Sequence, residues 1–321
     1  MRKQSKLTAL LAGVVLAGFT AGSPAFAAPK GTLVLGSTNS TSSHYVVSAA
    51  MVKAIKTGIP ASNVSQIETG ASVDNVRRLV KGEIDLGICG TDTAVQVLDG
   101  TGPFAGGKGV SDLVALYAYD VSVLNIAVSE DSKVTSVNEL SGKKFNPGIR
   151  GSGAELMTRG VFQTLGVTPD WVPGTVKDAA AGIQNRQIAG YSKYGPGAGI
   201  DATLRELMVS TPMRLLGFDA AQQSKVTANI KGVNFVSIPN VMPGQPAVQA
   251  PASLIVYATR TAVMDDETAH AIAKSIYENR QILIDAWPHL KNFDFKAQAF
   301  AAEKVGIKLH PGARKFWESV N

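Results

Sequence analysis

The feature that most constrains the fold is an alternation of short apolar runs with stretches of helical spacing, which continues along most of the chain. Residues 33–37, 64–69 and 84–90 are apolar runs of strand length, and helical patterns at 44–56, 73–81 and 91–99 follow them in turn. Repeated strand–helix units are typical of parallel sheets with helices packed on both faces. The sequence therefore predicts an α/β fold.

The same alternation predicts the remaining elements. Strands are expected at 114–119, 123–129, 143–147, 171–174, 188–194, 213–218, 233–239 and 254–259, and helices at 137–140, 152–165, 177–184, 198–208, 265–287 and 313–320. Residues 242–251 are a Pro-rich connection. Segments 76–89 and 180–192 share a helix–turn–strand pattern, with Gly82 and Asn185 at turns where both residue types tolerate a left-handed conformation. Two lobes built alike would explain the similarity, as would chance.

The N-terminus has the pattern of a secretory signal. Arg2, Lys3 and Lys6 precede an apolar run at 7–21, and the small residues Ala25 and Ala27 mark a cleavage site. We expect residues 1–27 to be a signal peptide and the mature chain to be periplasmic, with a retained N-terminal anchor as the alternative. Cys89 is the only cysteine and lies in an apolar run, so we expect it to be a buried, unpaired side chain.

Several classes of function have no support in the sequence. No dense basic block with interleaved aromatic residues is present, so we expect no nucleic-acid partner. The histidines lack metal-ligand spacing, and the nucleophile-elbow, phosphate-loop and dinucleotide-binding motifs are absent. We therefore expect no metal, no cofactor and no catalytic residue, and interpret the chain as a non-enzyme.

Three junctions between a strand and a helix carry unusual polar content. They span residues 37–45, 90–93 and 150–155, and the first of these reads STNSTSSHY. Ligands of α/β sheets gather at the carboxyl ends of strands, where free N–H groups at helix N-termini form anion sites. Plain helix capping by Ser, Thr and Asp is the alternative at each junction. For 37–45 the polar residues exceed what one cap requires, so binding is the preferred interpretation.

At these same residues the chain resembles the TAXI family, the extracytoplasmic solute-binding proteins of one branch of TRAP transporters. VDNVRRLVKGEIDLGI at 73–88, DGTGPF at 99–104 with the strand LVALYAYD at 113–120, GSGAELMTRGV at 151–161 and LHPGARKFWE at 309–318 are similar to the family's segments in the same order. The resemblance covers about residues 31–320 and is looser between roughly 175 and 250.

The resemblance implies a two-lobed periplasmic-binding-protein type II fold, with two doubly wound sheets joined by a hinge and a ligand between the lobes. Lobe I would contain residues 28–121 plus 252–321, and lobe II residues 122–251. It also implies that a small organic anion, such as a carboxylate, is delivered to TRAP membrane subunits in the periplasm. We expect a monomer. The alternatives are a periplasmic ligand sensor for a membrane receptor kinase and a secreted enzyme on the same scaffold.

The first junction departs from the family pattern G-T-G-G-T-G-G-T-Y-Y-P. Side chains replace its interior glycines, and His44 replaces the first tyrosine. These substitutions narrow the site and add hydroxyl and amide partners, which predicts a smaller ligand or one that carries donors of its own. Arg150 replaces a small residue before Gly-Ser-Gly and either faces a carboxylate or points to solvent. Tyr194 either contacts the ligand or is structural.

The expected ligand-binding residues come from both lobes. They are Ser37, Thr38, Asn39, Ser40, Thr41, Ser42, His44 and Tyr45 at the first junction, Thr91 and Asp92 at the second, Arg150, Gly151, Ser152, Gly153 and Ala154 at the third, and Tyr194 at the end of strand 188–194.

Overall fold

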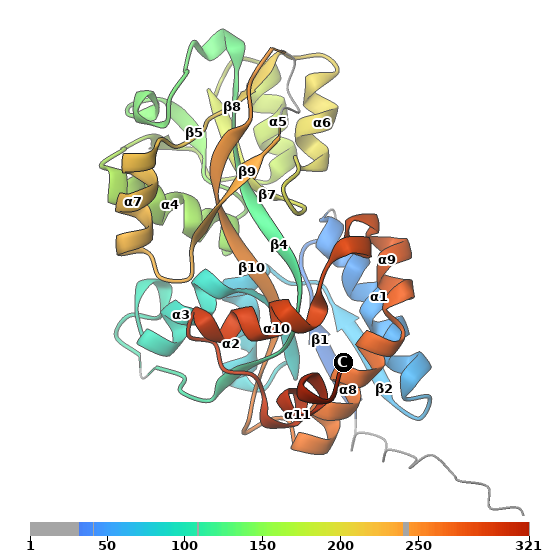
Figure 1. Cartoon of the computed structure of the whole chain (residues 1–321). Coiled ribbons are helices and arrows are strands. Elements are labelled where there is room, and N and C mark those ends of the chain that lie inside the picture. Colours follow the sequence, from blue (N-terminus) through green and yellow to red (C-terminus); the bar gives the residue numbers. More distant parts are fainter. Residues whose placement is uncertain (1–31, 41, 108, 240–243, 321) are drawn as a thin grey trace, which may run out of the picture.

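Two lobes joined by two long strands make up the computed structural model of the chain (Figure 1). The structure describes residues 32–40, 42–107, 109–239 and 244–320. The predicted signal peptide and Thr41 lie outside these residues. Strand β4 (Leu113–Ser129) and strand β10 (Val248–Arg260) each run through both lobes.

All the described strands belong to one hydrogen-bonded sheet of ten strands, whose main order is β2-β1-β3-β10-β4-β7-β5-β6. The other eight are β1 (Thr32–Gly36), β2 (Asn63–Ile67), β3 (Leu86–Gly90), β5 (Lys144–Asn146), β6 (Asp170–Trp171), β7 (Gly190–Gly195), β8 (Met213–Leu215) and β9 (Asn234–Ile238). β1 pairs in parallel with β2 and β3, and β5 with β6 and β7, whereas β4 and β10 are antiparallel to their neighbours. Because β4 and β10 are shared, the hydrogen-bonded ladder continues from one lobe into the other.

Helices cover the sheet in both lobes. The lower lobe of Figure 1 carries α1 (Ser43–Gly58), α2 (Ser72–Lys81), α3 (Thr91–Asp99), α8 (Asp266–Glu278), α9 (Arg280–Ala286), α10 (Phe295–Lys304) and α11 (Pro311–Ser319). The upper lobe carries α4 (Gly153–Leu165), α5 (Val176–Gln184), α6 (Ala202–Met208) and α7 (Ala220–Asn229). Single 3₁₀ turns are η1 (Gly102–Phe104), η2 (Glu130–Ser132), η3 (Val137–Leu140) and η4 (Pro288–Asn292). No helix in the described ranges is both long and apolar enough to cross a bilayer.

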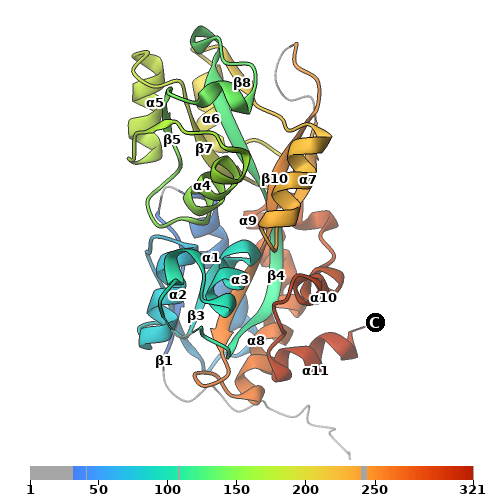
Figure 2. The ribbon, with the colours of Figure 1, turned by 90° about the vertical axis from the view of Figure 1, so that its left-hand side faces the viewer.

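The apolar core is divided in the same way as the helices. One cluster of buried residues draws on positions 33–119 and 254–317, and two smaller clusters draw on positions 123–252. We call the part around the first cluster lobe I and the part around the other two lobe II. Figure 2 shows α3 of lobe I opposite α4 of lobe II across the junction.

The strand pair β4–β10 holds the lobes together through an irregular ladder. Pairing runs from Ala252 opposite Val123 to Arg260 opposite Leu113, with register shifts after Ile255 and after Tyr257. Such irregularities increase the local twist of a strand pair. Both shifts lie at the lobe I end of the strand pair, where they increase its twist.

The buried carboxylate of Asp120 lies on β4 at the junction and binds groups from both lobes. It accepts hydrogen bonds from Ser122 Oγ at 2.6 Å and from the backbone N–H of Gly197, in lobe II, at 3.3 Å. The His289 ring of lobe I lies 2.8 Å away. Asp120 thus fixes lobe II elements against lobe I close to the pivot.

Several elements differ from the sequence prediction. Residues 114–119 and 123–129 form one strand, because the polar residues between them remain paired with β10. The helix expected at 265–287 is interrupted at Asn279, whose side chain donates to Ser275 O. Of the two turns predicted to be left-handed, the one at Gly82 has the expected positive φ. In the turn after α5 it is Arg186, with φ 56°, and not Asn185 that is left-handed.

Candidate ligand-binding site between the lobes

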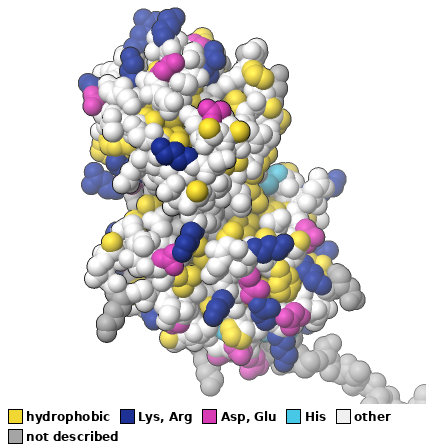
Figure 3. Space-filling model, turned by 60° about the vertical axis from the view of Figure 1, so that its left-hand side comes forward, with side chains coloured by type: hydrophobic (Ala, Val, Ile, Leu, Met, Phe, Trp, Pro, Cys, Tyr) yellow, Lys and Arg dark blue, Asp and Glu magenta, His cyan; other side chains and the backbone are white. Residues whose placement is uncertain are grey.

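A small pocket of about 80 Å³ lies where the two lobes meet, and we call it the central pocket. Figure 3 shows the lobes as two masses that join at a furrow with apolar side chains along it. Lobe I and lobe II both line the pocket. Its lining residues are Thr38, Asn39, Ser42, His44, Gly70, Ala71, Ser72, Ile88, Ile149, Ser152, Gly153, Ala154, Ser192, Lys193, Tyr194 and Ile255.

Three helices begin at the central pocket. Ser42 caps α1 by accepting from His44 N at 3.3 Å, and Ser152 caps α4 by accepting from Glu155 N at 3.2 Å. Ala71, at the start of α2, offers no side-chain cap. The first N–H groups of a helix have no partner within the helix, and they form its positive end. The pocket is therefore surrounded by positive helix ends from both lobes.

The starts of α2 and α4 face each other directly across the lobe junction. A methyl group built on Gly153, at the first position of α4, would lie 3.1 Å from Ser72 Oγ and 3.4 Å from Tyr194 Cε2. Two positive helix ends so close repel unless a negative charge lies between them. The starts of the two helices are therefore in contact, and each contributes positive potential beside the pocket.

The segment before α2 is held in a strained conformation. Ala71 has φ 72° and ψ −149°, a region that is essentially restricted to glycine. Thr69 fixes the segment, because its hydroxyl donates to Ser37 O at 2.7 Å and accepts from Ala71 N at 3.2 Å. Gly70 N also donates to the Asp74 carboxylate at 3.0 Å. These bonds turn the strained peptide toward the pocket.

Strand β7 supplies the polar side chains of lobe II. The buried hydroxyls of Ser192 and Tyr194 have no hydrogen-bond partner among the described residues. Between them, Lys193 Nζ lies 3.5 Å from Asp201 Oδ1 and 3.3 Å from Thr203 Oγ1, with its side chain 17% exposed. Asp201 partly offsets the Lys193 charge, so the helix ends and this lysine together supply the positive potential at the pocket.

His44 forms the wall of the pocket nearest the hinge. Its Nδ1 lies 2.9 Å from the Tyr119 hydroxyl, and its ring stacks on Trp287 with centroids 5.0 Å apart. Burial lowers the pKa of His44, an effect that the nearby Asp120 carboxylate opposes. The neutral ring therefore contributes shape and a hydrogen-bonding nitrogen rather than a cation.

The structure brings half of the predicted site residues to the central pocket. Those that line it are Thr38, Asn39, Ser42, His44, Ser152, Gly153, Ala154 and Tyr194. Ser37, Ser40 and Tyr45 are not among the lining residues: Ser37 is buried behind the pocket, and Ser40 N donates to Glu68. Thr91 lies near the junction, where its hydroxyl bonds Ser253 and Gly232, and Asp92 lines a different cavity.

Arg150 and Gly151 lie at an outer pocket of about 280 Å³, which Arg77 and Arg159 also line. Arg150 is exposed and makes no ion pair within the described part of the chain. Of the two orientations predicted for the Arg150 side chain, the structure has the one that is exposed to solvent. The guanidinium groups lie outside the central pocket.

One strand–helix junction at the pocket, residues 70–72, is not among the three that the sequence predicted. Gly70, Ala71 and Ser72 follow a strand and begin a helix, so the same strand-end rule applies to them. Their small side chains gave no polar signal, because the groups that matter there are backbone N–H groups. Ser192 and Lys193 were also not predicted, although Tyr194 was. Because side chains two apart on a strand share a face, the prediction of Tyr194 could have been extended to Ser192.

Comparison with known proteins gives a family and a fold. A sequence profile described as the NMT1-like family matches residues 35–319. The fold is similar to XAC2383 from Xanthomonas citri, solved bound to ATP (TM-score 0.53, 11% identity, 90% of this chain and 99% of that chain covered). It is also similar to a TctC solute-binding protein from Polaromonas (TM-score 0.50, 12% identity, 90% and 98% covered).

A structure described as a periplasmic transporter is a further match, with a TM-score of 0.53 and 12% identity over 88% of this chain and 100% of that chain. Identities this low bear on the fold alone. The predicted fold class, a two-lobed α/β fold of the periplasmic-binding-protein type, is confirmed. The two predicted sheets are joined into one ladder by the shared strands.

Proposed function

The chain belongs to the NMT1-like family, and from that premise we propose that it is the periplasmic solute-binding subunit of a TAXI-type TRAP transporter. In this proposal the central pocket captures a small organic anion, a carboxylate or a related group, and the protein delivers it to the membrane permease. Lobe I would comprise residues 28–121 plus 252–321 and lobe II residues 122–251. A monomer with a cleaved signal peptide is part of the same proposal.

The observation that carries the proposal is that two helix N-termini face each other across the junction. Ser72 begins α2 in lobe I, and Gly153 begins α4 in lobe II. An anion beside both helix starts accepts hydrogen bonds from backbone N–H groups of both lobes at once, which is not possible when the lobes are apart. A ligand with this preference for the closed state shifts the hinge equilibrium toward closure.

The pocket size supports a compact ligand. A water-sized sphere takes roughly 10–15 Å³ of such a space, so the pocket holds roughly five to eight of them. This corresponds to a carboxylate of two to four carbons or a sulfonate of similar size. The hydroxyls of Ser192 and Tyr194, which lack partners within the described part of the chain, suit an oxo or hydroxyl group on such an acid.

We propose that the ligand is released unchanged. No Asp, Glu or Cys is among the lining residues of the central pocket. His44 is the one lining side chain suited to proton transfer near neutral pH, and its ring is already engaged by Tyr119 and Trp287. This composition favours binding over turnover.

The test is a binding screen with short carboxylates and sulfonates, followed by calorimetry and by the fluorescence of Trp287, which stacks on His44. We expect a short acid to bind and to compact the protein in small-angle scattering. Lys193→Met should weaken binding about 10-fold or more, because a charge-assisted contact is lost.

Lys315→Met is the matched control, because Lys315 lies on the exposed side of α11 in lobe I, away from every inter-lobe pocket. It should leave the affinity unchanged. If no short acid compacts the protein, or if both lysine variants bind equally well, the anion proposal is wrong.

A further inference from the structure

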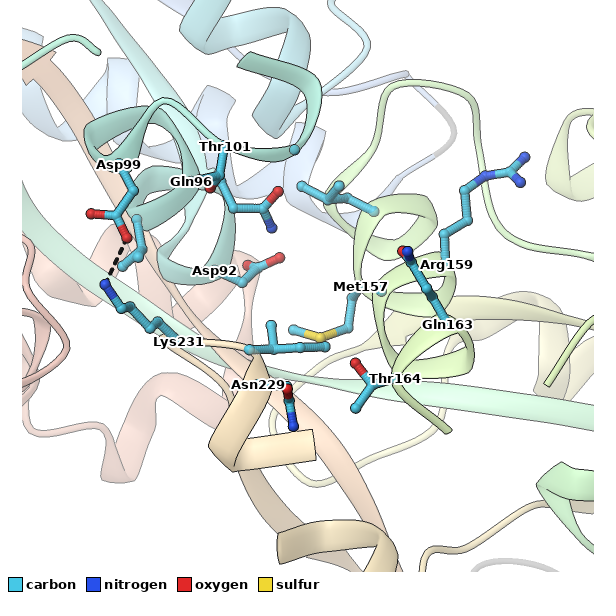
Figure 4. A pocket seen from close by; sticks show the side chains of 15 residues that line it. Asp92, Gln96, Asp99, Thr101, Met157, Arg159, Gln163, Thr164, Asn229 and Lys231 are labelled. Atoms are coloured by element: carbon cyan, nitrogen blue, oxygen red, sulfur yellow. Dashed lines mark hydrogen bonds and ion pairs between the residues drawn. The ribbon is translucent and has the colours of Figure 1, made fainter. Parts of the chain in front are cut away.

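A second and larger cavity lies between the lobes, and the anion proposal does not use it. It has a volume of about 530 Å³, and we call it the side cavity. Helix α3 of lobe I forms one wall, and helix α4 with the segment after α7 in lobe II forms the other (Figure 4). Val95, Met157 and Ile230 supply apolar atoms to these walls, and Gln96 and Gln163 supply polar groups.

The charges around the side cavity do not balance. Lys231 Nζ lies 2.8 Å from Asp99 Oδ2 across the lobe junction, so these two charges offset each other. Arg159 pairs with Glu155 at 3.0 Å and stacks on the ring of Trp171. Asp92 is therefore the lining charge that has no partner of opposite sign among the described residues.

Asp92 occupies a position where an unpaired carboxylate is costly. Its side chain is 1% exposed, and Oδ1 accepts the Ser253 hydroxyl at 2.6 Å. The other oxygen, Oδ2, is buried without a hydrogen-bond partner in the described part of the chain. Figure 4 shows the Asp92 carboxyl projecting from α3 toward the space between α3 and α4. A buried anion with a bare oxygen requires a donor, and a cationic donor most of all.

We propose that the side cavity is a second ligand site, which binds a primary amine in its ammonium form, with Asp92 Oδ2 as the anchor. An ammonium group has three N–H donors. Asp92 would accept one of them, and the side-chain oxygens of Gln96 and Gln163 are available in the walls for the others. The apolar atoms of the walls suit a short aliphatic chain. Asp99 is already paired with Lys231, so Asp92 is the one unpaired carboxylate that lines the cavity in the described part of the chain, which is too few for a divalent metal ion.

The site would also couple to the central pocket. Its walls come from both lobes, so an amine that touches both favours the same closed arrangement as the anion. Two ligands that favour one state raise each other's affinity by the same factor. We therefore expect bound amine to tighten acid binding, and this part of the proposal rests on the proposed function.

The experiment measures calorimetric binding of methylammonium, 1,4-diaminobutane and spermidine to the full mature chain, with 1,4-butanediol as the uncharged control. We expect a diamine or spermidine to bind and the diol not to bind. Asp92→Asn should weaken amine binding about 10-fold to 100-fold, because a charge-assisted contact becomes neutral. Asp170→Asn on the exposed edge strand β6 makes the same chemical change away from both pockets and should bind amines normally.

The pH dependence gives a second readout. Burial raises the pKa of Asp92 to about 6, so amine affinity should fall as the pH drops below about 6 and the carboxyl gains a proton. The groups around it are the Cys89 thiol on β3, the Tyr194 hydroxyl on β7, the Ser253 hydroxyl on β10 and the charged side chains of Asp99, Arg159 and Lys231. Burial raises the pKa of the Cys89 thiol and of the Tyr194 hydroxyl well above their usual values, so neither ionises near that pH.

Amine binding that survives Asp92→Asn, or the absence of binding for all three amines, overturns the proposal. Thermal melts of each variant establish that it is folded. The acid screen is scored separately, so a protein that binds acids but no amine refutes this site alone, and one that binds amines but no acid refutes the anion proposal.

Discussion

At the scale of single residues, the most informative position is Ala71. Backbone angles of this kind store strain of about 1–3 kcal/mol and are kept where the surrounding structure enforces them. Thr69 and Asp74 provide that enforcement here. The strain turns the uncapped start of α2 toward the opposite lobe, so a local cost in stability is coupled to the geometry of the pocket.

We predict that Ala71→Gly stabilises the fold. Glycine adopts these angles without strain, and the relief exceeds the extra entropy of the unfolded chain, so the free energy of unfolding should rise by about 1 kcal/mol. Urea denaturation measures the change. Ala105→Gly is the matched control, because Ala105 is exposed at φ −61° and should lose about 0.5–1 kcal/mol instead. A loss at both positions would mean that Ala71 is not strained.

At the scale of elements, the proposed mechanism depends on the contact between the starts of α2 and α4. Gly153→Ala adds a methyl group that must fit beside Ser72 Oγ, at 3.1 Å, only when the lobes are together. We predict that ligand affinity falls about 10-fold while the free energy of unfolding of the unliganded protein stays the same or rises slightly, because alanine favours the helix.

Calorimetry with the acid found in the screen, paired with urea denaturation, separates the two effects. Gly182→Ala in α5 makes the same helical substitution inside lobe II, where the nearest atom is Ile188 Cγ1, at 3.3 Å. It should leave the affinity unchanged. Equal affinity losses for the two variants would show that Gly153 acts through lobe II stability and not through closure.

The sequence predicted the elements that carry strong apolar patterns and missed those without them. Helix α7 has one buried residue, Val226, and is fixed instead by a capping box between Asp219 and Gln222. Because polar residues lie on all sides of α7, its sequence has no apolar periodicity that would predict a helix. The break at Asn279 was missed for the opposite reason, because the apolar spacing continues from α8 into α9.

The site divides along the same line. Junctions rich in Ser, Thr and Asn can be recognised in a sequence, and this is why Asn39 and Ser152 could be predicted as site residues. The start of α2 was not selected, because it contributes backbone groups that no side chain announces. Asp92 was grouped with the anion site from its place in the chain. The tilt of the lobes, which the sequence does not encode locally, directs it into the side cavity instead.

At the scale of the whole molecule, the proposed mechanism requires two lobes that open and close. The position of a β-carbon built on Gly153, 3.7 Å from Ser72 Cβ, matches the usual separation in a disulfide, about 3.8 Å. We predict that Ser72→Cys combined with Gly153→Cys forms a bond that locks the lobes together. The native Cys89 is fully buried and does not compete.

Small-angle scattering should show the oxidised double variant as compact without ligand, and exchange of a labelled acid should slow markedly. Reduction should restore opening, and each single-cysteine variant should behave as the reduced form. A double variant that oxidises fully yet exchanges ligand at the wild-type rate would show that binding does not depend on lobe motion.

The placement of β10 has a consequence for how the chain is made. Strand β3 pairs with β10, and the core of lobe I combines residues 33–119 with residues 254–317. Lobe II, by contrast, comes from one uninterrupted stretch. The core of lobe I therefore cannot be completed until residues 254–317 have been synthesised. Until then the apolar faces of residues 33–119 stay uncovered, and a holding chaperone has the largest apolar surface to shield.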